Sequence, residues 1–342
     1  MLEAVQLGNS GLRVSELCLG TMNFGIPGRG HQGDWTLTLE EARPIVKAAI
    51  DHGLFYFDCA DIYGLGASEE VVGALLKELL PRDEYVLATK IAMPMGRGAN
   101  QGGLSRKHVR EGIDACLQRT GHDYIDHLVI HRHPHGIPGS ARTPIEETLE
   151  ALHDAVKEGK VLYLGGSSMF AWQFAELQLT AKMNNWTPFV SMQNHHNLVY
   201  REEEREMNPY CASTGVALTP WSPLARGILA GSYQGGFSGG STSRSQGQDR
   251  KRTEGLYQGD HVFPIAERVI ETAIKYECSP AQIAVAWLKG RPEVTSPIVG
   301  VSKVSQLEDL VAAAAIELAA EDVAYLEELY QPVENLLSIG TS

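Results

Sequence analysis

The stretch Phe55-Tyr56-Phe57-Asp58-Cys59-Ala60, followed by Asp61-Ile62-Tyr63-Gly64, sets the pattern that decides the fold. Residues 55–60 form a short β-rich run with almost continuous apolar positions, as expected for a strand buried on both faces. Similar runs, each followed by an amphipathic helical segment, recur along the chain at residues 17–21, 85–90, 126–130, 161–167, 189–193, 216–221 and 297–300. Eight such units predict an α/β fold, a closed parallel (β/α)8 or TIM barrel.

The segments between these runs carry helix start and stop signals. Residues 39–52 predict a helix that stops at Gly53, a residue that readily takes a left-handed conformation. Ser105 can cap the backbone amides of a second helix. A third helix is predicted to begin near Pro144, in its first turn, and to end at Gly159.

Two segments depart from the alternation. Residues 5–17 predict an N-terminal β-hairpin that turns at Asn9-Ser10-Gly11 and closes the bottom of the barrel. Residues 231–260 are rich in Gly, Ser, Gln and Arg, lack periodicity, and predict a long lid loop after the seventh barrel strand. Because strand–helix units lie on both sides of this insertion, residues 1–342 are predicted to form one barrel domain.

Composition narrows the class of partner. The chain has 342 residues, which exceeds the ~250 residues of a bare barrel and leaves room for functional loops. Its formal charge of −13 opposes binding to nucleic acid or to an anionic membrane. Five scattered cysteines without a CxxC pair, and a start without signal-peptide features, favour a cytoplasmic protein. Nothing in the sequence indicates an oligomeric state.

Four ionisable residues fall where the predicted strands end, the edge of a barrel that carries its chemistry. They are Asp58, Tyr63, Lys90 and His131. Hydride arrival at a carbonyl carbon builds negative charge on oxygen, which a proton donor must neutralise. An ammonium beside a tyrosine favours the phenolate and can lower its pKa by roughly 1–3 units, and a carboxylate keeps that ammonium charged. We therefore expect carbonyl chemistry at this edge, with His131 orienting the substrate oxygen.

With these residues in place, the chain resembles the aldo-keto reductase superfamily over nearly its whole length. The opening Leu7-Gly8-Asn9-Ser10-Gly11-Leu12-Arg13-Val14-Ser15 with Leu19-Gly20-Thr21-Met22 is similar to that of long microbial members and of potassium-channel β-subunits. The family's Asp-x4-Tyr element matches Asp58 and Tyr63, its lysine matches Lys90 and its histidine matches His131. The resemblance implies reduction of an aldehyde or ketone, with Tyr63 as the proton donor.

The resemblance also implies a nicotinamide cofactor held by the late strands and loops. Trp221 is expected to provide a flat face for the nicotinamide, and Ser168 stands where the family has asparagine. Ser302 and Lys303, beside a predicted helix start, suit the 2′-phosphate of NADP(H) and predict a preference for NADPH over NADH. The predicted cofactor residues are Gly20, Thr21, Met22, Asp58, Ser167, Ser168, Gln193, Trp221, Ser222, Pro223, Leu224, Arg226, Gly227, Arg244, Gly300, Ser302, Lys303, Gln306 and Asp309.

The predicted ligand is a small-molecule carbonyl compound. Aromatic residues near the same edge predict a substrate pocket lined by Phe24, Trp35, Tyr63 and His131. Neither the identity of the substrate nor the choice between aldehyde and ketone follows from the sequence.

Two other functions are compatible with parts of the pattern. The histidines His131, His133, His135, His195 and His196 permit a metal-dependent barrel hydrolase, although Pro134 interrupts the strand and no metal site is predicted. A regulatory subunit that binds NADPH with little turnover is the second alternative, because channel β-subunits share the resemblance.

Overall fold

The computed structural model describes residues 1–30, 35–137, 142–233, 235–241, 246 and 249–332, and its central sheet has eight parallel strands. They are β3 (Cys18–Gly20), β4 (Tyr56–Asp58), β5 (Val86–Ile91), β6 (Ile125–Ile130), β7 (Val161–Ser167), β8 (Phe189–Gln193), β9 (Ala217–Leu218) and β10 (Ile298–Val299). Their order in the sheet is β10-β3-β4-β5-β6-β7-β8-β9. Parallel bridges Leu218↔Val294 and Trp221↔Ile298 join the two edges. The predicted barrel is therefore confirmed.

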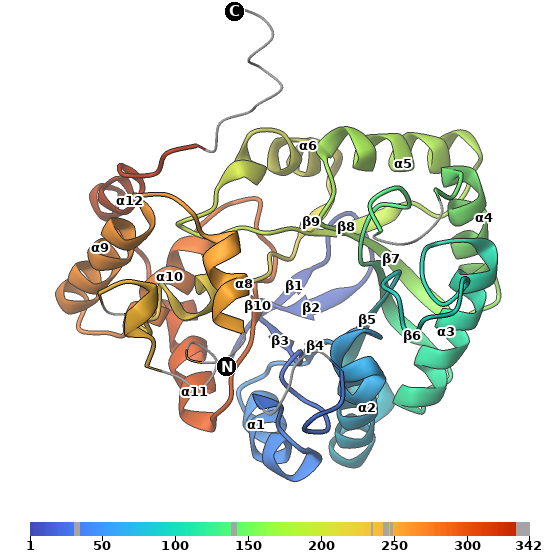
Figure 1. Cartoon of the computed structure of the whole chain (residues 1–342), viewed down its shortest axis with the longest axis horizontal. Coiled ribbons are helices and arrows are strands. Elements are labelled where there is room, and N and C mark those ends of the chain that lie inside the picture. Colours follow the sequence, from blue (N-terminus) through green and yellow to red (C-terminus); the bar gives the residue numbers. More distant parts are fainter. Residues whose placement is uncertain (31–34, 138–141, 234, 242–245, 247–248, 333–342) are drawn as a thin grey trace, which may run out of the picture.

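Helices surround the sheet, as Figure 1 shows. They are α1 (Leu39–Asp51), α2 (Ala67–Leu79), α3 (Arg106–Thr120), α4 (Ile145–Lys157), α5 (Ala171–Met183), α6 (Met207–Thr214), α8 (Asp249–Leu256), α9 (Val262–Lys275), α10 (Pro280–Lys289), α11 (Val304–Ala312) and α12 (Ala320–Glu327). Short 3-10 helices lie at Tyr63–Gly66, Arg82–Glu84, Glu202–Glu204, Ala225–Gly227, Phe237–Gly239 and Ala313–Ala315. No helix in the described ranges is both long and apolar enough to cross a membrane.

The predicted helix signals act at or near their expected places. The hydroxyl of Ser105 accepts a hydrogen bond from the amide of His108 at 3.3 Å, so it caps α3 as predicted. Helix α1 ends just before Gly53, whose φ of +82° turns the chain out of the helix. Pro144 is the N-cap of α4 rather than a residue of its first turn, because its ψ of 135° is extended.

The N-terminal hairpin pairs β1 (Ala4–Gln6) with β2 (Arg13–Ser15) in antiparallel register. Gly8 has a φ of +56°, and a Cβ there would lie 2.6 Å from the carbonyl oxygen of Val190 and 2.7 Å from that of Gly215. Val190 lies in β8 and Gly215 precedes β9, so the hairpin covers the amino-terminal end of the barrel. This close approach confirms the predicted position of the hairpin and explains why the turn needs glycine.

The barrel interior is apolar at this covered end. Leu7 and Val14 of the hairpin region join Tyr56, Ala88 and Ala217 in one buried cluster. Two further clusters fill the space between the sheet and the helices, and another joins α9, α10 and α12 with the loop after β9. The amino-terminal end is thus packed, and polar side chains concentrate at the carboxyl ends of the strands.

The segment 231–260 differs from the prediction of a lid without regular structure. It contains α8, whose Asp249 forms an ion pair with Arg226 of the preceding loop. The side chains of Arg226 and Asp249 are 5% and 12% exposed, so this pair holds α8 against the loop that follows β9. Because α8 is held by this ion pair, the hydrophobic periodicity of the sequence could not predict the helix. Arg244, predicted to contact the cofactor, lies outside the described residues.

Candidate active site

The structure brings Asp58, Tyr63, Lys90 and His131 together at the carboxyl ends of neighbouring strands. Asp58 ends β4, Lys90 lies near the end of β5, and His131 follows β6. The ammonium of Lys90 donates to Asp58 Oδ2 at 2.5 Å and lies 3.3 Å from the hydroxyl of Tyr63. The rings of Tyr63 and His131 meet edge to face, with centroids 5.9 Å apart. Strand order, rather than sequence proximity, creates this cluster.

Tyr63 owes its position to a turn directly after β4. The amide of Asp61 bonds to the carbonyl of Lys90, and the amide of Tyr63 bonds to that of Ala60. Gly64 then adopts a φ of +57° inside the 3-10 helix Tyr63–Gly66. This left-handed step suits glycine. It follows the tyrosine at once, so the chain turns toward α2 while the Tyr63 side chain stays beside Lys90.

Lys90 is fully buried yet remains an ammonium. Burial lowers its pKa, but the charge of Asp58 and the hydrogen bond to it act in the opposite direction, and the net pKa of Lys90 is raised above its ordinary value. The carbonyl oxygen of Cys59 accepts a further hydrogen bond from its Nζ at 2.7 Å. The expectation that a carboxylate keeps this ammonium charged agrees with the structure.

The pKa of Tyr63 contradicts the expected direction. Burial raises the pKa of this phenol, and although Lys90 lowers it, the net shift is upward. Burial is the largest cause, and the charge of Asp58, which also pairs with Lys90, raises the Tyr63 pKa further. Tyr63 is therefore a protonated phenol at neutral pH, with a cation placed to stabilise the phenolate once its proton leaves.

His131 is neutral. Burial is the largest cause of a pKa well below the ordinary value of a histidine, and the charges of Lys90, Arg132 and Arg252 lower it further. Its Nδ1 is buried without a hydrogen-bond partner among the described residues. A neutral imidazole carries one N–H, so His131 can donate to one substrate oxygen and orient it.

Gln193, at the end of β8, is one of the predicted cofactor residues and is in direct contact with Asp58. Its Nε2 donates to Asp58 Oδ1 at 2.9 Å, so both carboxylate oxygens of Asp58 are engaged. The neighbouring Asn194 has a buried Oδ1 without a partner among the described residues. This oxygen is thus a buried hydrogen-bond acceptor that the described residues leave unused.

Trp221 stands opposite these amides as part of an aromatic stack. Its ring lies parallel to that of His195, with centroids 4.0 Å apart and an angle of 7° between planes. Tyr200 stacks on the other face of His195 at 4.2 Å. The indole Nε1 donates to Ser168 Oγ at 3.1 Å, and Ser168 has a φ of +49°. Sequence reasoning predicted Trp221 but missed the stack behind it.

The loop after Trp221 is tightly wound. Ser222, Ala225 and Arg226 all have positive φ, at 57°, 47° and 57°. The guanidinium of Arg226, predicted to contact the pyrophosphate, pairs with Asp249 and also donates from Nε to Thr253 Oγ1 at 3.1 Å. The charge of Arg226 is therefore paired with a carboxylate of α8, and no short-range sequence signal indicated this partner.

The predicted adenosine end lies at the start of α11. Ser302 donates from its amide and its hydroxyl to Gln306 Oε1, at 2.8 and 3.1 Å, and Lys303 is the exposed N-cap residue. Asp309 accepts a hydrogen bond from Ser279 Oγ at 2.6 Å. The start of α11 thus holds Ser302, Lys303 and Gln306, whereas Asp309 is bonded to Ser279, the N-cap residue of α10.

The residues predicted near the N-terminal rim have mixed positions. Thr21 is fully buried, and its hydroxyl donates to the carbonyl of Asp58 at 3.0 Å. Met22 and Trp35 are partly exposed. Phe24 has no exposed surface and belongs to the apolar cluster around α1 and α2. Its expected place in an open substrate pocket is therefore corrected to core packing.

The histidines suggested for a metal site have separate partners. His195 bonds to the hydroxyl of Tyr257 at 2.8 Å, and the ring of His133 lies against that of His135. His196 bonds to Glu204 at 2.8 Å. Within the part of the chain that the structure describes, no three His, Cys, Asp or Glu side chains are grouped to hold a metal ion.

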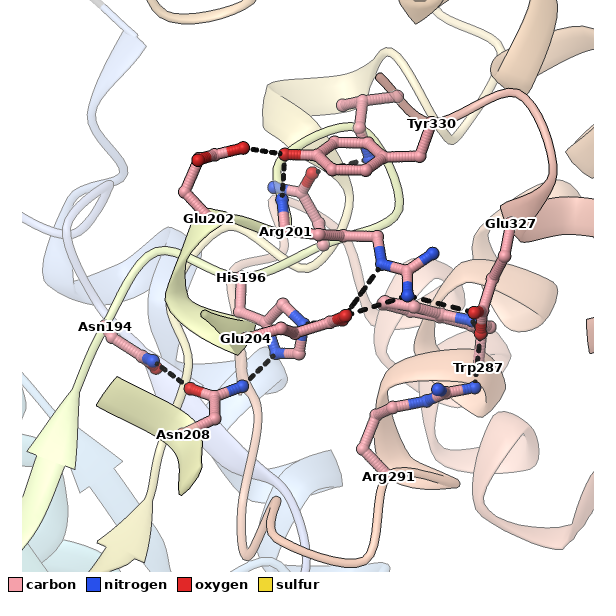
Figure 2. A network of polar contacts seen from close by, with 12 residues as sticks. Asn194, His196, Arg201, Glu202, Glu204, Asn208, Trp287, Arg291, Glu327 and Tyr330 are labelled. Carbon is pink, nitrogen blue, oxygen red and sulfur yellow. Dashed lines mark hydrogen bonds and ion pairs between the residues drawn. The ribbon is translucent and has the colours of Figure 1, made fainter. Parts of the chain in front are cut away.

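A polar network missed by sequence reasoning extends from the rim to the C-terminal helix (Figure 2). Asn194 donates to Asn208 at 2.7 Å, and Glu204 accepts from both His196 and Arg201. Arg201 also pairs with Glu327 of α12. Arg201 and Glu204 are three residues apart, whereas Glu327 is far from both in sequence and only the fold brings it to Arg201.

Comparison with known proteins agrees with this geometry. The model of the aldo/keto reductase family matches residues 16–331. A putative aryl-alcohol dehydrogenase of Schizosaccharomyces pombe is 44% identical, covering 96% of this chain and 95% of that protein. Versiconal hemiacetal acetate reductase of Aspergillus parasiticus is 40% identical, covering 97% and 98%. An aldo-keto reductase of Alternaria alternata is 41% identical, covering 95% and 91%. This chain belongs to the aldo/keto reductase family of oxidoreductases.

Proposed function

We propose that the protein reduces an aldehyde or ketone to an alcohol with NADPH, and that Tyr63 gives the proton. The observation that carries the proposal is the chain of contacts from Asp58 through the buried Lys90 to the hydroxyl of Tyr63, at 2.5 and 3.3 Å. A phenol held beside an ammonium is a proton donor whose conjugate base is already stabilised.

Each residue of the cluster has a separate task. Tyr63 transfers its phenolic proton to the carbonyl oxygen as negative charge develops there. Lys90 stabilises the phenolate that remains, and Asp58 holds Lys90 in place and charged. His131, as a neutral donor beside Tyr63, orients the same oxygen. The arrangement places a proton donor, a cation and a hydrogen-bond donor around one position.

The rim residues fit a nicotinamide cofactor. Trp221 is only partly buried and its ring has His195 stacked on it, so it suits a flat aromatic ring on its open side. Gln193, Ser168 and the unpartnered amide oxygen of Asn194 suit the carboxamide. When bound, the reduced cofactor supplies the hydride that reaches the carbonyl carbon. Ser302 and Lys303 would hold the 2′-phosphate.

Aromatic aldehydes are the first substrates to test. Two relatives that are more than 40% identical to this chain are named putative aryl-alcohol dehydrogenases. Tyr63 beside Lys90 and Trp221 beside Ser168 supply aromatic side chains. A panel of substituted benzaldehydes, followed by loss of NADPH absorbance, therefore tests the reaction class.

Tyr63→Phe tests the assigned proton donor. Removing a general acid should lower kcat by about 10²–10⁴-fold, while the NADPH Kd measured by fluorescence titration stays within about twofold. Tyr325→Phe, on the exposed face of α12, is the matched control and should leave both values unchanged. A normal rate for Tyr63→Phe would refute the role. Tight NADPH binding without turnover of any carbonyl by the wild type would support the regulatory alternative.

The preference for NADPH over NADH has its own measurement. A charged hydrogen bond to the 2′-phosphate is worth ~1.5–3 kcal/mol, which predicts a kcat/KM ratio of roughly ten to over a hundred. Lys303→Met should reduce this ratio by lowering the NADPH value alone, because the Lys303 side chain is exposed and forms no ion pair or hydrogen bond with the other described residues. Equal kcat/KM values for the two cofactors would overturn the assignment.

A further inference from the structure

Arg132 lies directly after His131 and forms no ion pair with an acidic residue of the described part of the chain. Its side chain is partly buried, and Nη1 donates to the carbonyl of its neighbour His131 at 2.6 Å. Every other partly buried arginine of the described residues forms an ion pair with a carboxylate, as Arg82 does with Asp126 and Arg119 with Glu69. Arg132 is therefore an unneutralised cation beside the reacting groups.

A second arginine approaches the same place from the lid. Arg252 is exposed on α8, one helical turn after Asp249, the residue that pairs with Arg226 and docks the helix. Its charge acts on both His131 and Arg132, although Arg252 is far from these two neighbouring residues in the sequence. The docking of α8 thus sets two guanidinium groups near one histidine.

This arrangement is unfavourable without a ligand. Burial is the main cause of a lowered pKa for Arg132, and the charge of Arg252 lowers it further, while Tyr63 offsets only part of the effect. The chain carries 42 acidic residues and a net charge of −13, yet none of its described carboxylates forms an ion pair with either guanidinium. An anion bound between them would remove this repulsion.

We infer that Arg132 and Arg252 form a binding site for a carboxylate carried by the carbonyl substrate itself. The inference rests on the proposed reduction, because it places the anion on the molecule whose carbonyl meets Tyr63 and His131. Guanidinium groups bind carboxylates in a bidentate, planar manner that fixes orientation as well as affinity. Since the protein's net charge repels anions at long range, selection of an acidic substrate requires such a local cation pair.

The test compares paired substrates that differ only in charge. We would measure kcat/KM at saturating NADPH for 3- and 4-carboxybenzaldehyde and for their methyl esters. The wild type should favour one acid over its ester by about tenfold or more. Arg132→Gln should reduce this acid-to-ester ratio at least about tenfold, and Arg252→Gln, which alters an exposed residue, should reduce it a few-fold. Arg250→Gln removes a neighbouring charge that pairs with Glu254 and should leave the ratio unchanged.

Other outcomes separate this inference from the proposed function. An ester preferred equally by all four proteins would overturn the carboxylate site while leaving carbonyl reduction intact. If the arginine variants instead raise the Kd for NADPH and leave the ratio unaltered, the pair holds a cofactor phosphate and the inference fails. Calorimetry with terephthalate gives a readout without turnover: binding that weakens in Arg132→Gln supports the site even if no aldehyde is reduced.

Discussion

Burial and ion pairing determine which residues of the site are protonated at neutral pH. Lys90 has a pKa raised by Asp58 and Tyr63, so it stays charged, while His131 has a lowered pKa and stays neutral. Tyr63 has a raised pKa and keeps its proton. Only Tyr63 among these three is thus a neutral acid whose conjugate base meets a neighbouring cation. The residue that carries the proton is set by the environment of each group.

These directions predict the pH dependence of reduction. A donor whose pKa lies above its ordinary value of ~10 stays protonated until the pH exceeds that value. We therefore expect kcat for carbonyl reduction to be constant between about pH 6 and 9 and to decline only above. Single-turnover rates with bound NADPH would measure it without product release. A decline centred near pH 7 would contradict the prediction and would indicate that the cofactor lowers the Tyr63 pKa.

At the residue scale, the sequence predicted the positions of the four site residues more accurately than the directions of their pKa shifts. The positions of Asp58, Tyr63, Lys90 and His131 follow from strand ends, which apolar runs reveal. The direction of the Tyr63 pKa does not, because desolvation depends on how completely neighbours cover the phenol. The pairing of Arg226 with Asp249 was also hidden, since it joins residues 23 positions apart through the fold.

For the strands and helices, the hydrophobic pattern of the sequence predicted some bounds well and others poorly. Strands β7 and β8 have the predicted bounds because long apolar runs mark them, whereas β9 and β10 are shorter than expected. Pro220 follows β9 and has no N–H to extend the ladder, although its carbonyl accepts a bond from Ile298 at 2.8 Å. Helix α8 was missed because its docking is ionic and its sequence is almost entirely polar.

Close contact between α2 and α3 yields a prediction about one glycine. A Cβ at Gly73 would lie 2.2 Å from the carbonyl oxygen of Thr120, and backbone cannot move aside as a side chain can. Gly73→Ala should therefore lower the free energy of unfolding by about 1–3 kcal/mol, measured by urea denaturation. Gly255→Ala, in α8 with nothing near its Cβ, is the control and should be neutral or slightly stabilising. Equal effects of the two changes would argue against tight helix contact.

Across the whole molecule, the barrel buries neutral histidines in several places. Burial lowers the pKa of His127 and His195 to about 3, and of His122 and His133 to about 4. His127 has no exposed surface and is satisfied by Tyr56 and Ser191, each at 2.8 Å. In a protonated imidazole both ring nitrogens are donors, so the hydroxyl that donates to the neutral ring would have to rotate and accept instead.

These histidines make the fold sensitive to acid. Each has a folded pKa below its unfolded value of ~6.5, so between the two values the unfolded chain binds more protons and stability falls as the pH falls. Glu203 acts oppositely, since burial raises its pKa to about 7 and stabilises the fold as the pH falls toward ~4.5. Burial also raises the pKa values of Asp61 and Asp126. The histidines with lowered pKa values, which include His108 and His131, outnumber these three carboxyls, so we expect the free energy of unfolding to decrease from about pH 6.5 to 5.

Denaturant titrations across this range would measure the slope. His127→Gln should reduce it by up to about 1.4 kcal/mol per pH unit, because one buried titrating group is removed even if the variant is less stable at every pH. Constant or rising stability between pH 6.5 and 5 would mean that the buried imidazoles bind protons without unfolding, so that the barrel interior admits charge more readily than its packing implies.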